Sequence, residues 1–113
     1  MLLRALLVVI AFVLAACTYV EARTTQYIGV PRYAPTDPKT VQVLRSEPQE
    51  RHERLGEVLL DISVDPQPPV EDIERKLQEE AAKWGANAVY VVRNTITRAD
   101  GHKLIAIAIR FRQ

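Results

Sequence analysis

The sequence has one cysteine, few aromatic residues and no excess of either charge. A single cysteine excludes a disulfide framework within the chain and any zinc site built on several thiolates. With 15 basic and 14 acidic residues the net charge is +1, so bulk electrostatics gives no indication of nucleic-acid binding. Glycine-rich phosphate loops, His-Glu-x-x-His and Gly-x-Ser-x-Gly motifs are also absent from the sequence. We therefore expect neither an enzyme nor a nucleic-acid-binding protein.

The first 16 residues have the three parts of a secretory signal. Residues 1–4 carry one positive charge, residues 5–14 are uncharged and apolar, and the small residues Ala15 and Ala16 follow. A membrane-spanning helix needs about 20 apolar residues, whereas this run is only about a dozen long. We expect residues 1–16 to be an export signal rather than a membrane span.

The only cysteine lies directly after Leu14, Ala15 and Ala16. This Leu-Ala-Ala-Cys stretch resembles the bacterial lipobox, in which the cysteine sulfur receives a diacylglycerol and becomes the mature N-terminus. The resemblance implies that Cys17 is the lipidation site of a palmitate-type lipoprotein, held durably because several acyl chains are buried. Thr18 stands where many inner-membrane lipoproteins carry aspartate, which implies the outer membrane, facing the periplasm. The alternative is that Cys17 is a small apolar residue near an ordinary cleavage site.

Residues 17–40 contain three prolines and no sustained period of 2.0 or 3.6 residues. We expect this segment to be the lipidated N-terminus followed by an extended tether. About 20 extended residues reach several tens of ångströms. The alternative is that residues 25–30 form an edge strand that packs Tyr27 on the domain.

A compact domain is expected over residues 41–113. Residues 41–45 and 56–62 are apolar enough for two strands, and the polar residues 47–54 form a solvated loop between them. In the second strand one face consists of three alternating apolar residues that we expect in the core, namely Val58, Leu60 and Ile62.

The clearest periodic segment predicts one helix after the prolines of residues 66–69. Its apolar stripe has spacings of 3 and 4 residues and consists of Val70, Ile73, Leu77, Ala81 and Trp84. Gly85 is expected to end the helix as a left-handed cap. Three acid-before-base pairs four residues apart are expected on the solvated face: Glu71 with Arg75, Asp72 with Lys76, and Glu79 with Lys83.

Two further strands are expected over residues 88–94 and 103–112, with a hairpin turn at Asp100 and Gly101 between them. The order β-β-α-β-β predicts an α+β fold, a two-layer sandwich in which one helix packs on a small, mainly antiparallel sheet.

The last strand is apolar on both faces, because Ile105, Ile107, Ile109 and Phe111 alternate with Leu104, Ala106 and Ala108. One helix covers one face only. We expect the face with Ala106 and Ala108 to meet another partner. The candidates are the tether folding back through Tyr27 or Tyr33, a second copy of the domain, or a different envelope protein.

The stretch from Ala82 to Val89, followed by a valine-rich strand and the Leu-Ile-Ala-Ile-Ala run, resembles the YbjQ type of heavy-metal-binding domain and the RcsF envelope-stress lipoproteins. The resemblance covers residues 57–111 and is most specific over residues 85–89. A structural role explains this junction without a ligand, because Gly85 caps the helix and Asn87 satisfies backbone groups at the turn.

The sequence departs from these families in two ways. The disulfides of the RcsF relatives cannot form here, because Cys17 is the only cysteine. A soft metal requires thiolates or clustered imidazoles, whereas the domain offers only His52 and His102, which we expect to be solvated. We therefore assign no catalytic, cofactor-binding or metal-binding residue, and no cofactor.

These observations predict a membrane-tethered, periplasm-facing lipoprotein that acts as a non-enzymatic interaction or envelope-sensing module. Its partners are the membrane, through the lipid anchor, and either another protein or a second copy. The alternative is a lipoprotein that binds a metal or a small ligand at the envelope.

Overall fold

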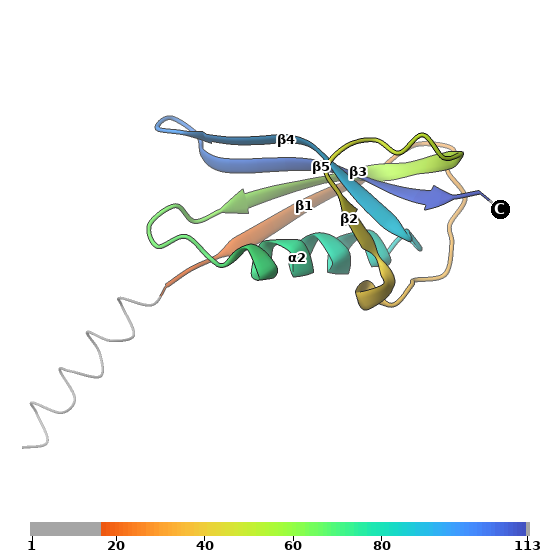
Figure 1. Ribbon diagram of the computed structural model, residues 1–113, viewed down its shortest axis with the longest axis horizontal. Helices are drawn as coiled ribbons and strands as arrows, with labels where there is room; N and C mark the ends of the chain where they lie inside the picture. Colours follow the sequence, from red (N-terminus) through yellow and green to blue (C-terminus); the bar gives the residue numbers. More distant parts are fainter. Residues whose placement is uncertain (1–16, 113) are drawn as a thin grey trace, which may run out of the picture.

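The computed structural model describes residues 17–112, so the expected export signal lies outside the described residues. The described chain contains β1 (Val20–Gln26), the short 3-10 helix η1 (Pro38–Thr40), β2 (Gln42–Leu44), β3 (His52–Ile62), α2 (Val70–Ala82), β4 (Ala88–Thr97) and β5 (Gly101–Phe111). The strands form one sheet in the order β1-β3-β5-β4-β2, antiparallel except for the pair of β2 and β4 (Figure 1). The predicted α+β fold, with one helix on a small, mainly antiparallel sheet, is therefore confirmed.

The expected tether is wrong, because β1 belongs to the sheet. All seven residues of β1 pair with β3, from Val20 opposite Ile62 to Gln26 opposite Gly56. Val20 and Ala22 pack against the core, whereas Glu21 and Arg23 are exposed. The alternative, an edge strand over residues 25–30, is right that an edge strand forms, but β1 begins five residues earlier and ends at Gln26. The folded domain thus begins about 20 residues earlier than residue 41.

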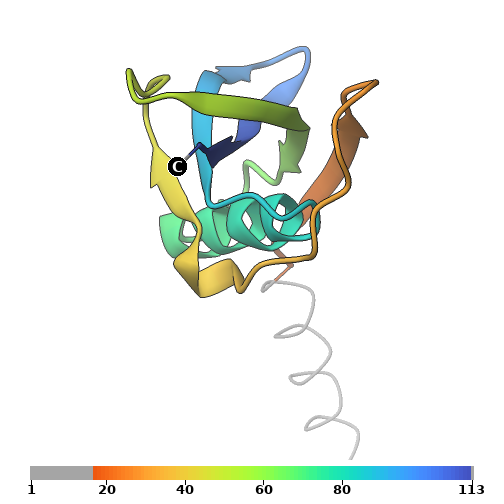
Figure 2. The same cartoon turned by 90° about the vertical axis from the view of Figure 1, so that its right-hand side faces the viewer.

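The rest of the expected tether, residues 27–40, is also bound to the domain. The backbone N–H of Tyr27 donates to the Leu55 carbonyl, and that of Thr36 donates to the Ala82 carbonyl at the end of α2. The Thr36 hydroxyl donates to the Ala86 carbonyl at 2.6 Å. These bonds place the segment across the end of the helix, as Figure 2 shows.

The core lies between α2 and one face of the sheet. Val58, Leu60 and Ile62 are buried there, as the alternation of β3 predicts. The strand begins earlier than expected, at His52, so the polar connection from β2 is shorter than residues 47–54. This connection joins strands that are not neighbours in the sheet.

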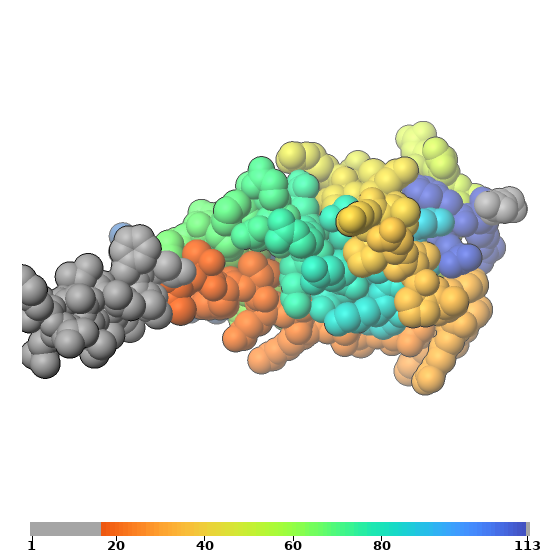
Figure 3. All heavy atoms as spheres, turned by 90° about the horizontal axis from the view of Figure 1, so that it is seen from below, coloured from red at the N-terminus to blue at the C-terminus, as the bar shows by residue number. Residues whose placement is uncertain are grey.

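The predicted helix is confirmed, with Ile73, Leu77 and Ala81 buried against the sheet. Its first stripe residue, Val70, is exposed, and Trp84 lies beyond the helix end, partly buried against the core. Figure 3 shows the outer surface of α2 between β1 on one side and η1 and β2 on the other.

The expected ion pairs of the helix are replaced by others. Asp72 pairs with Arg75 three residues later, at 3.0 Å. Glu80 is buried and receives two lysines, Lys83 at 2.9 Å and Lys76 at 3.6 Å. A buried carboxylate without such partners would be costly, so these lysines have a clear physical role.

Both expected turns of the C-terminal half are confirmed. Gly85 and Gly101 have positive φ angles of 78° and 72°, as the helix cap and the hairpin turn require. The Asn87 side chain accepts a hydrogen bond from the Phe111 backbone N–H at 2.9 Å, which is the structural role expected for the junction.

The expectation for the second face of the sheet is wrong in its orientation. Leu104, Ala106 and Ala108 face α2 and are buried in the main core. The opposite face carries Ile105 and Ile107, which are half-buried. A small second cluster partly covers this opposite face; it contains Ala88, Tyr90 and Ile109, with Leu44, Ile107 and Phe111 packed around them.

Candidate functional site

The strongest candidate site is a groove beside the helix, which we call the α2–β4 groove. It has a volume of about 350 Å³, within the range of small-molecule sites. Its apolar lining comes from four elements and consists of Val43, Leu44, Val70, Ile73, Leu77, Val91 and Leu104. Its polar lining is Arg45, Gln67, Glu74, Asn94 and His102.

The groove exists because β2 is short. β2 pairs with only three residues of β4, from Gln42 opposite Ala88 to Leu44 opposite Tyr90. Beyond Tyr90, β4 continues to Thr97 with β5 on one side and no strand of the described chain on the other. The helix-facing side of this stretch therefore opens beside α2 instead of being closed by a strand.

His102 gives the groove its most unusual group. Its side chain is only 4% exposed, although no acidic residue pairs with it in the described part of the chain. Nε2 lies 2.6 Å from Oδ1 of Asn94, so Nε2 carries the proton and donates to the amide oxygen. Nδ1 is buried and has no hydrogen-bond partner. A ligand that donates a hydrogen bond to Nδ1 would remove the cost of this unsatisfied acceptor.

His102 therefore corrects the expectation that both histidines are solvated. The alternation of β5 places His102 on the same face as Leu104 and Ala106, toward the helix. His52 is also largely covered, with 12% of its side chain exposed. Its ring lies edge-on to Tyr90 and Phe111 on the opposite face of the sheet, so the two histidines do not share a site.

A second hollow, of about 420 Å³, lies at the end of the sheet near Tyr33 and Arg110. The Tyr33 hydroxyl donates to the Glu53 carboxylate at 2.6 Å, and this hydrogen bond, aided by burial, raises the pKa of Tyr33. The Arg110 guanidinium stacks 4.3 Å from the Tyr33 ring centroid and donates to the Gly85 carbonyl. These groups bind one another rather than a ligand. We interpret their contacts as the ones that hold residues 27–40 on the sheet.

A cluster of polar side chains around Glu47 holds residues 45–51, which connect β2 to β3, on the sheet. Glu47 accepts a hydrogen bond from Arg54 at 2.6 Å and lies 3.1 Å from Nε2 of His52. The hydrogen bond from Arg54, supported by that from His52, lowers the pKa of Glu47. The cluster is exposed and charge-paired, which suits a structural contact rather than a reactive centre.

The described residues contain no arrangement that could hold a metal ion with three or more histidine, cysteine or acidic side chains. In the groove, His102 lies beside an amide and apolar side chains rather than beside a nucleophile. The arrangement can thus bind an apolar molecule with a polar end, and it offers no group that we can assign to catalysis.

Cys17, the expected lipidation site, is exposed at the start of the described chain. Within the described residues, no helix is long and apolar enough to cross a membrane. The sequence alone did not indicate that Val70, Ile73, Leu77, Leu104 and His102 share a groove. The signal that was there is the even-numbered alternation of β5, which places His102 in line with the buried Leu104, Ala106 and Ala108.

Comparisons with known proteins give the fold and little more. No protein-family model and no curated protein matches the sequence. Among solved structures, the chain is similar to the crystal structure of a Francisella virulence factor, FvfA, with a TM-score of 0.59 and 16% sequence identity. The match covers 84% of this chain and 100% of the FvfA chain. At this identity the likeness shows a shared fold alone.

Proposed function

We propose that this protein is a lipid-anchored, non-enzymatic binding module of the bacterial cell envelope that takes up an apolar ligand or an apolar part of a partner in the α2–β4 groove. The observation that carries the binding role is the groove itself, which is lined by seven aliphatic side chains and by the buried His102, whose Nδ1 has no hydrogen-bond partner. The envelope location is supported by the resemblance of residues 14–17 to the lipobox, and the outer membrane by Thr18. The resemblance to the YbjQ and RcsF families agrees with such a module.

The chemistry of the groove defines the ligand class. Seven aliphatic side chains favour a hydrocarbon chain or an aliphatic side chain of a peptide. Nδ1 of His102 is an acceptor, so the ligand should carry a hydroxyl or amide N–H near that end. This deepens the small-ligand alternative; for the metal alternative, the described residues offer no cluster.

Binding can be tested with N-phenyl-1-naphthylamine, an apolar dye that fluoresces on leaving water, and with aliphatic alcohols as competitors. Val70→Glu places a charge in the groove, because Val70 lines it and is 61% exposed. Val92→Glu is the matched control, since Val92 is similarly exposed, at 52%, but does not line the groove. We expect Val70→Glu to weaken dye binding at least tenfold and Val92→Glu to leave it unchanged. Equal binding by both variants and the unchanged protein would contradict a role of the groove.

His102→Leu tests the polar end of the site. Removing Nδ1 should weaken binding of an aliphatic alcohol several-fold more than binding of the corresponding alkane, because only the alcohol donates to Nδ1. If the two ligands lose affinity equally, the imidazole contributes only shape.

The anchor is tested separately. Cys17→Ala should abolish partition of the protein into detergent with the membrane fraction, because the acyl chains are lost. Persistent membrane fractionation of this variant at high salt would show that lipidation is not the anchor.

A further inference from the structure

We propose that the end of the sheet next to Cys17 rests directly on the lipid bilayer, with Tyr19, Val64 and Ile96 in the headgroup region. This inference rests on the proposed acylation of Cys17. It goes further, because it fixes which surface of the domain faces the membrane and how close it lies.

The first argument is the short distance between Cys17 and the folded domain. β1 begins at Val20, and the hydrogen bonds already include Tyr19: its backbone N–H donates to the Ser63 hydroxyl at 3.1 Å, and its carbonyl accepts from the Ser63 backbone N–H at 3.0 Å. Only Thr18 separates this bonded residue from Cys17. Three extended residues span at most about 11 Å, so acyl chains on Cys17 would hold Val20 within that distance of the anchor.

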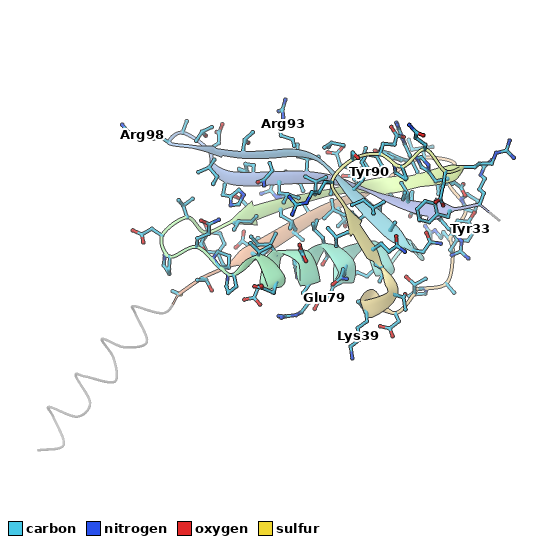
Figure 4. The ribbon with its side chains drawn as sticks, in the orientation of Figure 1. Tyr33, Lys39, Glu79, Tyr90, Arg93 and Arg98 are labelled. Carbon is cyan, nitrogen blue, oxygen red and sulfur yellow. The ribbon has the colours of Figure 1, made fainter. Side chains whose placement is uncertain are left out.

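The second argument is which residues share this end. The register of the sheet aligns Val20 with Ile62, Ile62 with His102, and His102 with Ile96. The turn after β3 and the hairpin between β4 and β5 therefore lie at the same end as Cys17. Figure 1 shows these loops together with the start of β1, and Figure 4 places Arg98 at the hairpin tip and Tyr33 at the far end.

The third argument is the apolar character of this end. Tyr19, Val64 and Ile96 are 52%, 47% and 59% exposed, one on each of three adjoining segments. Val64 lies against the hairpin turn, since its Cγ2 is 3.9 Å from the position of a β-carbon at Gly101. Tyrosine is enriched at membrane interfaces because it combines an apolar ring with a polar hydroxyl.

Charge at this end does not favour anionic lipid. Arg98 at the hairpin tip is offset by Asp100 two residues later, and Asp65 follows Val64. The contact we propose is therefore apolar and should form on vesicles of zwitterionic phosphatidylcholine, without a requirement for anionic lipid.

The test uses the full-length lipoprotein, purified from bacterial membranes and reconstituted into phosphatidylcholine vesicles that carry a nitroxide-labelled lipid as quencher. The variants Val64→Cys and Ile96→Cys each supply one free thiol for an NBD fluorophore, since an acylated Cys17 has no free thiol. Ile28→Cys is the matched control, because Ile28 is a fully exposed aliphatic residue two positions after β1 ends, at the opposite end of the sheet. Circular dichroism checks that each labelled variant is folded.

We expect the lipid quencher to reduce the fluorescence at positions 64 and 96 at least threefold more than at position 28. Similar quenching at all three positions would overturn the inference, and the domain would then present this apolar end to a protein partner or to solvent. Mass spectrometry of the same preparation separates the two proposals. A preparation without the lipid mass on Cys17 refutes both proposals, whereas an acylated protein with uniform quenching refutes only the membrane contact.

Discussion

Replacing Gly85 with alanine tests how strongly the residues before β2 depend on the end of the helix. Gly85 has a φ of +78°, a conformation that costs an L-residue about 1–2 kcal/mol. A β-carbon there would lie 2.5 Å from Cβ of Tyr33 and 2.7 Å from the Ala34 carbonyl oxygen. Relief requires moving backbone, so the hydrogen bond from Tyr33 to Glu53 and the Arg110 stacking should also be lost. Overpacking of this kind costs about 1–3 kcal/mol, so together with the conformational cost we expect a destabilisation of about 2–5 kcal/mol.

Gly29→Ala is the matched control for this prediction. Gly29 has a similar φ of +83°, but a β-carbon there meets nothing within 4 Å. Gly29→Ala should therefore cost only the conformational penalty of about 1–2 kcal/mol. Urea unfolding of the Cys17→Ser protein, followed by the fluorescence of the only tryptophan, Trp84, measures both variants. A Gly85→Ala protein within about 0.5 kcal/mol of Gly29→Ala would refute the reasoning, because the clash would then be relieved at no cost.

Three further predictions concern the two faces of the sheet and the polar clusters. Ala106→Glu should destabilise the fold by more than about 3 kcal/mol in thermal unfolding, because Ala106 is fully buried under α2. Ile105→Glu should destabilise the fold clearly less, because Ile105 lies on the half-buried opposite face. Equal losses of stability in the two variants would contradict the assigned faces. Glu47→Gln should lower the urea midpoint at about pH 7, and the deficit should disappear as the pH falls through the depressed pKa of Glu47, because the carboxylate stabilises the fold only above it. Tyr33→Phe should lower stability at about pH 8, and its deficit should shrink as the pH rises through the raised pKa of Tyr33; a deficit that stays constant up to about pH 12 would contradict the Glu53 hydrogen bond as its cause.

The segments that could be predicted from the sequence are those in which one local signal dominates. The helix follows from a stripe in which Ile73, Leu77 and Ala81 all turn toward the sheet, and from Gly85 just after it. The hairpin follows from Gly101 between two strongly β-forming runs. In both cases residues close in sequence determine the backbone conformation, and the tertiary structure is compatible with it.

β1 could not be predicted from the sequence because it is an edge strand. Only Val20 and Ala22 of its core-facing positions are apolar, and Glu21 and Arg23 alternate with them over just four residues. Most of its stabilisation comes from backbone pairing with β3, which any sequence without proline can provide. The orientation of β5 failed for a related reason. Both faces are apolar, so only the side to which the helix packs distinguishes Ala106 from Ile107.

The inclusion of β1 in the sheet determines how close to the bilayer an acylated Cys17 would hold the domain. A tether of more than 20 residues would let an anchored domain move tens of ångströms away from the bilayer. The domain would then have no fixed orientation relative to the membrane. With hydrogen bonds already formed at Tyr19, an acylated Cys17 would instead hold the domain at the membrane surface by one end. His102 lies in the row of residues that defines this end, and the α2–β4 groove includes it. A ligand with a hydrocarbon chain and a hydroxyl or amide group would therefore meet the groove close to the surface of the bilayer from which such molecules come. Binding in the groove and contact with the bilayer should then reinforce each other, and an affinity for aliphatic alcohols that is higher for the vesicle-bound protein than for Cys17→Ser in solution would be the sign of that coupling.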